Sequence, residues 1–137
     1  MVEFLKSILD ITSDALTELD VDVITASHGQ EAWSMIAEHD LIVDMVITDL
    51  EMSVMNGRQL CRRIRAHRKL KRIPVVFFAN NTDSTTEIGI FKDCASDYLV
   101  KPFMKELFLA RISLHLKNYT FNERLREMVE KWVLNRR

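Results

Sequence analysis

The sequence predicts an α/β protein, in which helices cover both faces of a parallel β-sheet. Two short apolar runs of strand length, 45–49 and 74–79, alternate with segments whose apolar residues recur at helical spacing. The connections between these segments span only a few residues, as in repeated strand–helix–strand units. Because such crossovers are right-handed, they place helices on both faces of one sheet.

The N-terminal segment is predicted to be helical. Between residues 2 and 19 the apolar residues recur at helical spacing, with acidic residues on another face. No strand is expected before this helix. A short β segment is then expected at 21–25, and a second helix is expected to begin near residue 27.

Three further strands are predicted. The run 45–49 is apolar on both faces until its last residue, as a strand between two helical layers should be. The run 74–79 begins with a proline, at a position where no ladder donor is lost, and a third strand is expected at 97–100. Helices are expected between these strands, at 58–67 and 85–92.

The C-terminal helix is predicted to be longer than one domain requires. From residue 105 the helical pattern continues without a breaker, so we expect a globular domain over 1–117 and a helical extension over 118–137. A helix that packs on its own sheet explains the pattern up to about residue 116. Beyond it, dimerisation or a helical connector is favoured, because the residues there recur at the 4-3 spacing of a coiled coil. The residues in this pattern are Leu114, polar Asn118, Phe121, Leu125, Met128 and Trp132.

Size and composition are those of one soluble domain. The 137 residues are 47% hydrophobic and 28% charged, and the formal net charge is −1. This charge predicts no general attraction to nucleic acid or to an anionic membrane. We also expect no signal peptide and no membrane-spanning helix, since basic first residues and a run of roughly 18 apolar residues are both missing.

The cysteines and histidines suggest no metal site. Cys61 and Cys94 are too few for a disulfide framework and lack the paired spacing of a zinc site. A reducing compartment, the cytoplasm by default, is therefore expected. The four histidines are scattered without ligand spacing and are better explained as surface or satisfied residues.

An acid and a base each close a predicted strand. Asp49 ends the run 45–49, and Lys101 follows the run 97–100. Because the carboxyl ends of parallel strands share one edge, the two side chains can meet in a crevice there. Lys101 could then pair with Asp49, or with an anion attached to it. Taken separately, Asp49 could be a helix cap or turn-former, and Lys101 a solvated lysine.

Four motifs resemble the receiver domains of two-component response regulators. They stand in family order and at family spacing: VITDLEM at 46–52, MNG at 55–57, IPVV at 73–76 and ASDYLVKPF at 95–103. The resemblance covers roughly residues 20–117. It implies a flavodoxin-like receiver fold and a signalling protein that is not an enzyme.

The resemblance also implies roles for particular residues. Asp49 would be the phosphoacceptor, served by a histidine kinase or a small phosphodonor, and Lys101 would hold the phosphoryl oxygens. The ligands of Mg²⁺ would be the Asp49 carboxylate and the Glu51 backbone carbonyl. Phosphoryl transfer depends on positioning and on neutralising charged oxygens, which an ammonium group and a hard cation can do. Tyr98 stands at the aromatic switch position, with a half-buried strand aromatic as the alternative.

The sequence departs from the family pattern at two places. Family members begin with a strand that ends in an acidic pair and completes the metal site, whereas here the first strand and the pair are expected to be missing. A rearranged sheet, a strand borrowed from a partner chain, or a natural chain that begins upstream could fill the gap. Asp10, Asp14 and Glu18 could replace the pair but are better explained as a solvated helix face. Ala79 occupies the switch position of the family's Thr or Ser.

Two functions follow from this pattern. One is a phosphorylation switch whose change a downstream signalling protein reads. The alternative is a degenerate receiver that serves as a dimerisation or scaffolding module. Nucleic-acid binding is not expected: the basic segment 58–72 has neither a recognition-helix signature nor stacking aromatics, so a solvated helix face and loop explain it better.

Overall fold

The computed structural model describes residues 2–3, 16–19, 21–39, 43–49, 57–80, 94–101 and 103–135. In this part of the chain one parallel sheet has the strand order β2-β1-β3-β4-β5. This is the order of flavodoxin-like doubly wound folds. The strands are β1 Val2–Glu3, β2 Ile24–Thr25, β3 Val46–Asp49, β4 Val75–Asn80 and β5 Asp97–Lys101.

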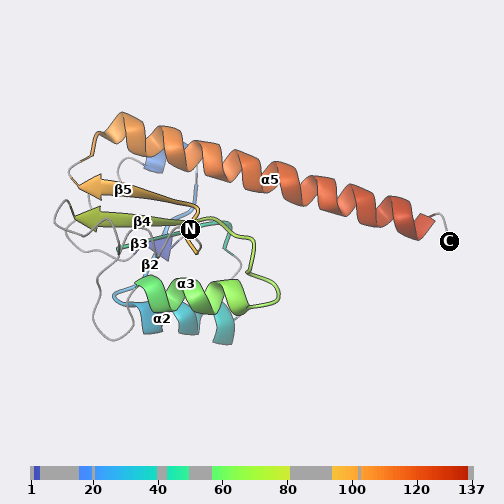
Figure 1. Ribbon diagram of the computed structural model, residues 1–137, viewed down its shortest axis with the longest axis horizontal. Coiled ribbons are helices and arrows are strands. Elements are labelled where there is room, and N and C mark those ends of the chain that lie inside the picture. Colours follow the sequence, from blue (N-terminus) through green and yellow to red (C-terminus); the bar gives the residue numbers. More distant parts are fainter. Residues whose placement is uncertain are drawn as a thin grey trace.

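Helices cover both faces of the sheet. Figure 1 shows α2 and α3 on one face and the long α5 on the other, with α5 projecting far beyond the strands. The sequence prediction of a parallel α/β fold is therefore confirmed. The described helices are η1 Thr17–Leu19, α2 Gly29–Trp33, η2 Ser34–Glu38, α3 Gly57–Ala66 and α5 Lys105–Asn135.

Alternation along the strands divides the core into two clusters. Val46 contributes to the cluster under α2 and α3, and the next residue, Ile47, contributes to the cluster under α5. Both are completely buried, as expected for a parallel strand between two helical layers. From α3, Leu60 and Ile64 pack into the first cluster, and from α5, Ile112 packs into the second.

The first strand is present, which corrects the sequence prediction of a missing strand. Val2 and Glu3 pair with β2 on one side and with β3 on the other, so β1 occupies the centre of the sheet. Neither a rearranged sheet nor a borrowed strand is needed. Two residues are too few to show strand periodicity in the sequence. Their pairing with two neighbouring strands outweighs the local helical pattern that was predicted from residue 2. Asp10, Asp14 and the predicted helix at 85–92 lie outside the described residues.

The C-terminal helix α5 is continuous through residue 117. Phe108 and Ile112 are buried against the sheet, whereas Phe121, Met128 and Trp132 each leave more than half of their surface exposed. No helix within the described residues is long and apolar enough to cross a membrane.

Candidate functional site

Asp49 and Lys101 form an ion pair at the carboxyl edge of the sheet. Lys101 Nζ lies 3.3 Å from Asp49 Oδ2. The Asp49 side chain is 9% exposed and that of Lys101 is 23% exposed. A mostly buried carboxylate is costly unless a charge or hydrogen bonds compensate it, and the ammonium group supplies such compensation. The predicted meeting of acid and base is thus observed.

The strand register explains this meeting. Asp49 at the end of β3 is in register with Phe78 of β4, and Lys101 at the end of β5 is in register with Asn80. Because β4 lies between β3 and β5, the two strand ends lie on either side of it. Both side chains therefore reach the same edge from strands that are not neighbours.

Gly57 lets the first turn of α3 approach this edge closely. A Cβ atom at this position would lie 2.3 Å from the Asp49 carbonyl oxygen and 2.6 Å from a ring carbon of Phe77. Real Cβ atoms do not approach other atoms so closely. Glycine is thus required by packing, and it fixes α3 against the backbone of the candidate acceptor.

Aromatic packing anchors the chain just after Lys101. The Phe103 ring stacks on Phe78 with 5.0 Å between ring centroids, and on Phe108 with 5.7 Å. Phe78 belongs to β4 and Phe108 to α5, so Phe103 ties the chain after β5 to both elements. This cluster restrains the backbone from which Lys101 projects.

The two predicted switch residues lie on neighbouring strands. Ala79 is buried in β4 and is in register with Val100 of β5. It directly follows Phe78, the residue of β4 that is in register with Asp49. Alanine offers no hydroxyl group to this site. Tyr98 of β5 is half-buried and packs against the core cluster under α3.

The described residues do not by themselves form a metal centre. They contain no group of three or more His, Cys, Asp or Glu side chains that could hold an ion. Glu51, whose carbonyl was predicted as a ligand, lies outside the described residues. The strand β1 does end on an acid, Glu3, whose backbone is in register with Ile47, two residues before Asp49.

Sequence reasoning missed two clusters that position β5. Asp97 at its start accepts one hydrogen bond from Arg111 Nη1 at 2.8 Å and pairs with His115 Nε2 at 3.0 Å, which joins the strand to α5. Cys61 and Cys94 form a disulfide, which their number and spacing did not predict. The regular spacing of Arg111 and His115, one helical turn apart, could have indicated a shared partner.

Comparison with known proteins agrees with this geometry. A model of the response regulator receiver domain matches residues 2–113. The chain is 31% identical over 103 residues to a chemotaxis protein CheY homolog of Campylobacter jejuni, covering 74% of this chain and 78% of that protein.

Solved structures share the fold. A response regulator receiver domain protein from Clostridium thermocellum superimposes with a TM-score of 0.71 at 25% identity, covering 90% of this chain and 94% of that one. The receiver domain of the sensor histidine kinase PA1611 from Pseudomonas aeruginosa superimposes with a TM-score of 0.71 at 20% identity, covering 85% of this chain and 93% of that one. That structure holds a magnesium ion in its active-site cleft. At 20% identity, the similarity supports only a shared fold.

The strand order and the helices on both faces of the sheet define a flavodoxin-like α/β domain. The chain belongs to the response regulator receiver domain family of two-component signalling.

Proposed function

We propose that this domain accepts a phosphoryl group on Asp49 and signals by protein–protein contact. The observation that supports this most strongly is the 3.3 Å contact between Lys101 Nζ and Asp49 Oδ2 at the carboxyl edge of the sheet. Ligands of open α/β sheets bind at this edge. The phosphodonor is a histidine kinase or a small acyl phosphate, and a downstream protein reads the result.

In the proposed step a carboxylate oxygen of Asp49 attacks the phosphorus of the donor. An acyl phosphate oxygen–phosphorus bond, or a phosphohistidine nitrogen–phosphorus bond, breaks as the new oxygen–phosphorus bond forms, and the donor leaves with the bonding electrons. The Lys101 ammonium group moves from the carboxylate to the transferred oxygens and neutralises their charge. The protein thereby acts as a signalling module and not as a catalyst of metabolism.

Mg²⁺ binding at this site stays a prediction. Asp49 and the Glu51 carbonyl are the predicted ligands, and Glu3 is the one acid at the end of β1. Mg²⁺ prefers several oxygen ligands in octahedral geometry, which Asp49 alone does not supply. We therefore expect weak binding of the ion. Isothermal titration calorimetry with magnesium, with Glu3→Gln and Asp49→Asn as comparisons, measures it.

We propose that residues 118–137 act as a helical extension that joins two copies of the chain. Phe121, Leu125 and Met128 belong to the apolar 4-3 pattern of α5. Their exposed fractions are 63%, 43% and 65%, so this apolar face is left uncovered within the described part of the chain. A contiguous apolar stripe on a projecting helix is typical of an interface. Asn118 at a core-like position of this stripe helps to fix the register.

A degenerate receiver is the second candidate function. The observation that favours it is Ala79, which lacks the hydroxyl group that would bond a phosphoryl oxygen. In that case the Asp49–Lys101 pair only stabilises the fold, and the domain acts as a dimerising or scaffolding module.

Nucleic-acid binding is not favoured, because Arg65 and Arg72 of the basic segment bond to groups of this protein. A cytoplasmic location stays a prediction from the sequence.

Intact mass spectrometry separates the two functions. The full chain is incubated with acetyl phosphate and millimolar Mg²⁺, beside Asp49→Asn. A single phosphoryl addition to the wild-type chain, absent from the variant, is the expected result. Equal masses for both proteins would remove the phosphorylation switch and leave the degenerate receiver.

A further inference from the structure

The disulfide joins two elements that lie far apart in the sequence. Cys61 of α3 and Cys94, just before β5, are separated by 33 residues, and their Cα atoms lie 6.2 Å apart. They are the two cysteines of the chain. Cys61 is completely buried, whereas Cys94 is partly exposed. Cys94 is thus the more accessible residue of the pair.

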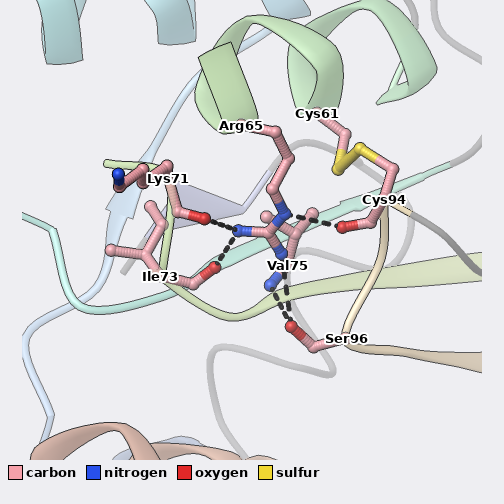
Figure 2. The surroundings of a disulfide bond; sticks show 7 residues. All are labelled: Cys61, Arg65, Lys71, Ile73, Val75, Cys94 and Ser96. Carbon is pink, nitrogen blue, oxygen red and sulfur yellow. Dashed lines mark hydrogen bonds between the residues drawn. A yellow bond between two sulfur atoms is a disulfide. The ribbon is translucent and has the colours of Figure 1, made fainter. Parts of the chain in front are cut away.

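A second tie holds the same two elements. Arg65, one helical turn after Cys61, donates from Nε to the Cys94 carbonyl oxygen at 2.8 Å. It also donates from Nη1 to the carbonyl oxygens of Lys71 at 3.0 Å and Ile73 at 2.6 Å. Figure 2 shows the guanidinium group among these acceptors, beside the disulfide. Burial lowers the pKa of Arg65 from its ordinary value, but an arginine stays charged at neutral pH.

A third contact fixes the segment to the sheet. Ser96 Oγ accepts a hydrogen bond from the Val75 backbone N–H at 3.1 Å, and the Ser96 N–H donates to the Val75 carbonyl oxygen at 2.8 Å. Arg65 Nη2 approaches the same Ser96 Oγ at 3.4 Å. Residues 94–96 therefore have several non-covalent attachments to α3 and β4 in addition to the sulfur–sulfur bond.

We propose that Cys61 and Cys94 form a reversible redox site, which a dithiol reductant opens through Cys94 while Arg65 and Ser96 retain the fold. Disulfides inside reducing compartments are usually transient and redox-sensing. This site combines a partly exposed cysteine with a segment that also has non-covalent attachments to α3 and β4. The site is separate from the Asp49 edge and needs no phosphodonor.

The exchange balances in two steps. A thiolate of the dithiol attacks the Cys94 sulfur, a mixed disulfide forms, and Cys61 leaves as a thiolate that takes up a proton. The second thiolate of the reductant then attacks the reductant sulfur that is bonded to Cys94, and Cys94 leaves as a thiolate that takes up a proton. Two electrons pass from the dithiol, which becomes a cyclic disulfide, to the protein, which gains two thiols. Glutathione disulfide reverses the reaction and leaves as two glutathione molecules.

Maleimide trapping with intact mass measures the site in the full chain. The oxidised protein should add no maleimide after denaturation, and the protein first treated with dithiothreitol while folded should add two. Treatment with glutathione disulfide should return the count to none, with the chain still monomeric in covalent mass. Thiols that appear only when reduction follows denaturation, or two additions without reduction, would each overturn the proposal.

Thermal unfolding tests the second tie. Reduction of the wild-type chain should lower the melting temperature by about 10 °C and leave one cooperative transition, because a loop of this size gains entropy in the unfolded state. In Arg65→Gln, reduction should abolish the cooperative transition or lower its midpoint at least twice as far. Arg62→Gln, an exposed position of the same helix, is the matched control and should behave as the wild type. Equal shifts in both variants would show that Arg65 does not retain the reduced fold.

Discussion

Lys101 Nζ contacts Asp49 Oδ2 at 3.3 Å, although 52 residues separate the two side chains in the sequence. Sheet order produces this contact, since β3 and β5 flank β4 and end at the same edge. The carboxylate is mostly withdrawn from water but reached by a partly exposed ammonium group. In the proposed function, the ammonium group exchanges one negative partner, the carboxylate, for another, a phosphoryl group attached to it.

Removing the ammonium group should destabilise the domain. In Lys101→Met the free energy of unfolding should fall by about 2 kcal/mol at neutral pH, because the Asp49 carboxylate is left buried without this cation. Urea unfolding measures the loss. The double variant Asp49→Asn with Lys101→Met is the control and should regain at least half of it. If both variants lose the same stability, the pair does not compensate the buried charge.

A side chain at position 57 should disrupt the edge. Gly57→Ala places a Cβ atom 2.3 Å from the Asp49 carbonyl oxygen, so α3 or β3 must shift. The free energy of unfolding should fall by about 3 kcal/mol. Arg62→Ala, on the exposed side of α3, should change it by less than about 0.5 kcal/mol. Similar small changes in both variants would contradict the close approach.

Restoring a hydroxyl group at position 79 should strengthen retention of the phosphoryl group. In Ala79→Thr the phosphorylated fraction at a fixed acetyl phosphate concentration should rise about threefold or more, since a new hydrogen bond adds about 1 kcal/mol. Ala79→Val has the same shape without the hydroxyl and serves as the control for added volume at this buried position. Equal phosphorylated fractions in the two variants would rule out a hydrogen bond from position 79.

Shortening α5 should prevent self-association. Sedimentation should give a dimer for the full chain and a monomer for a chain cut after Lys117, because the exposed apolar stripe lies beyond that residue. Leu125→Ser combined with Met128→Ser should also give a monomer, whereas Thr120→Ala should not. A monomer mass for the uncut chain would remove the dimer proposal.

Local sequence signals predicted most of the sheet and its acid–lysine edge. The apolar run up to Asp49 and the run after Pro74 carry strand signals long enough to read, and parallel topology then brings Lys101 to the same edge. Helix α3 was predicted equally well, because Leu60, Cys61 and Ile64 form its buried stripe.

The remaining features depend on tertiary structure and left little trace in the sequence. The two residues of β1 acquire strand geometry only from pairing with β2 and β3. Arg65 stands in a basic run typical of a solvated face, and only the folded chain surrounds it with three carbonyl oxygens. The disulfide likewise requires Cys61 and Cys94 to be adjacent in space, which their separation of 33 residues does not indicate.

Fluorine NMR of beryllofluoride, a phosphoryl mimic, tests the central claim most directly. With the full chain and millimolar Mg²⁺, we predict protein-bound fluoride resonances that are absent from Asp49→Asn and weakened in Lys101→Met. Resonances of free beryllofluoride alone in the wild-type spectrum, or bound resonances that survive in Asp49→Asn, would contradict the assignment of Asp49 as the phosphoryl acceptor.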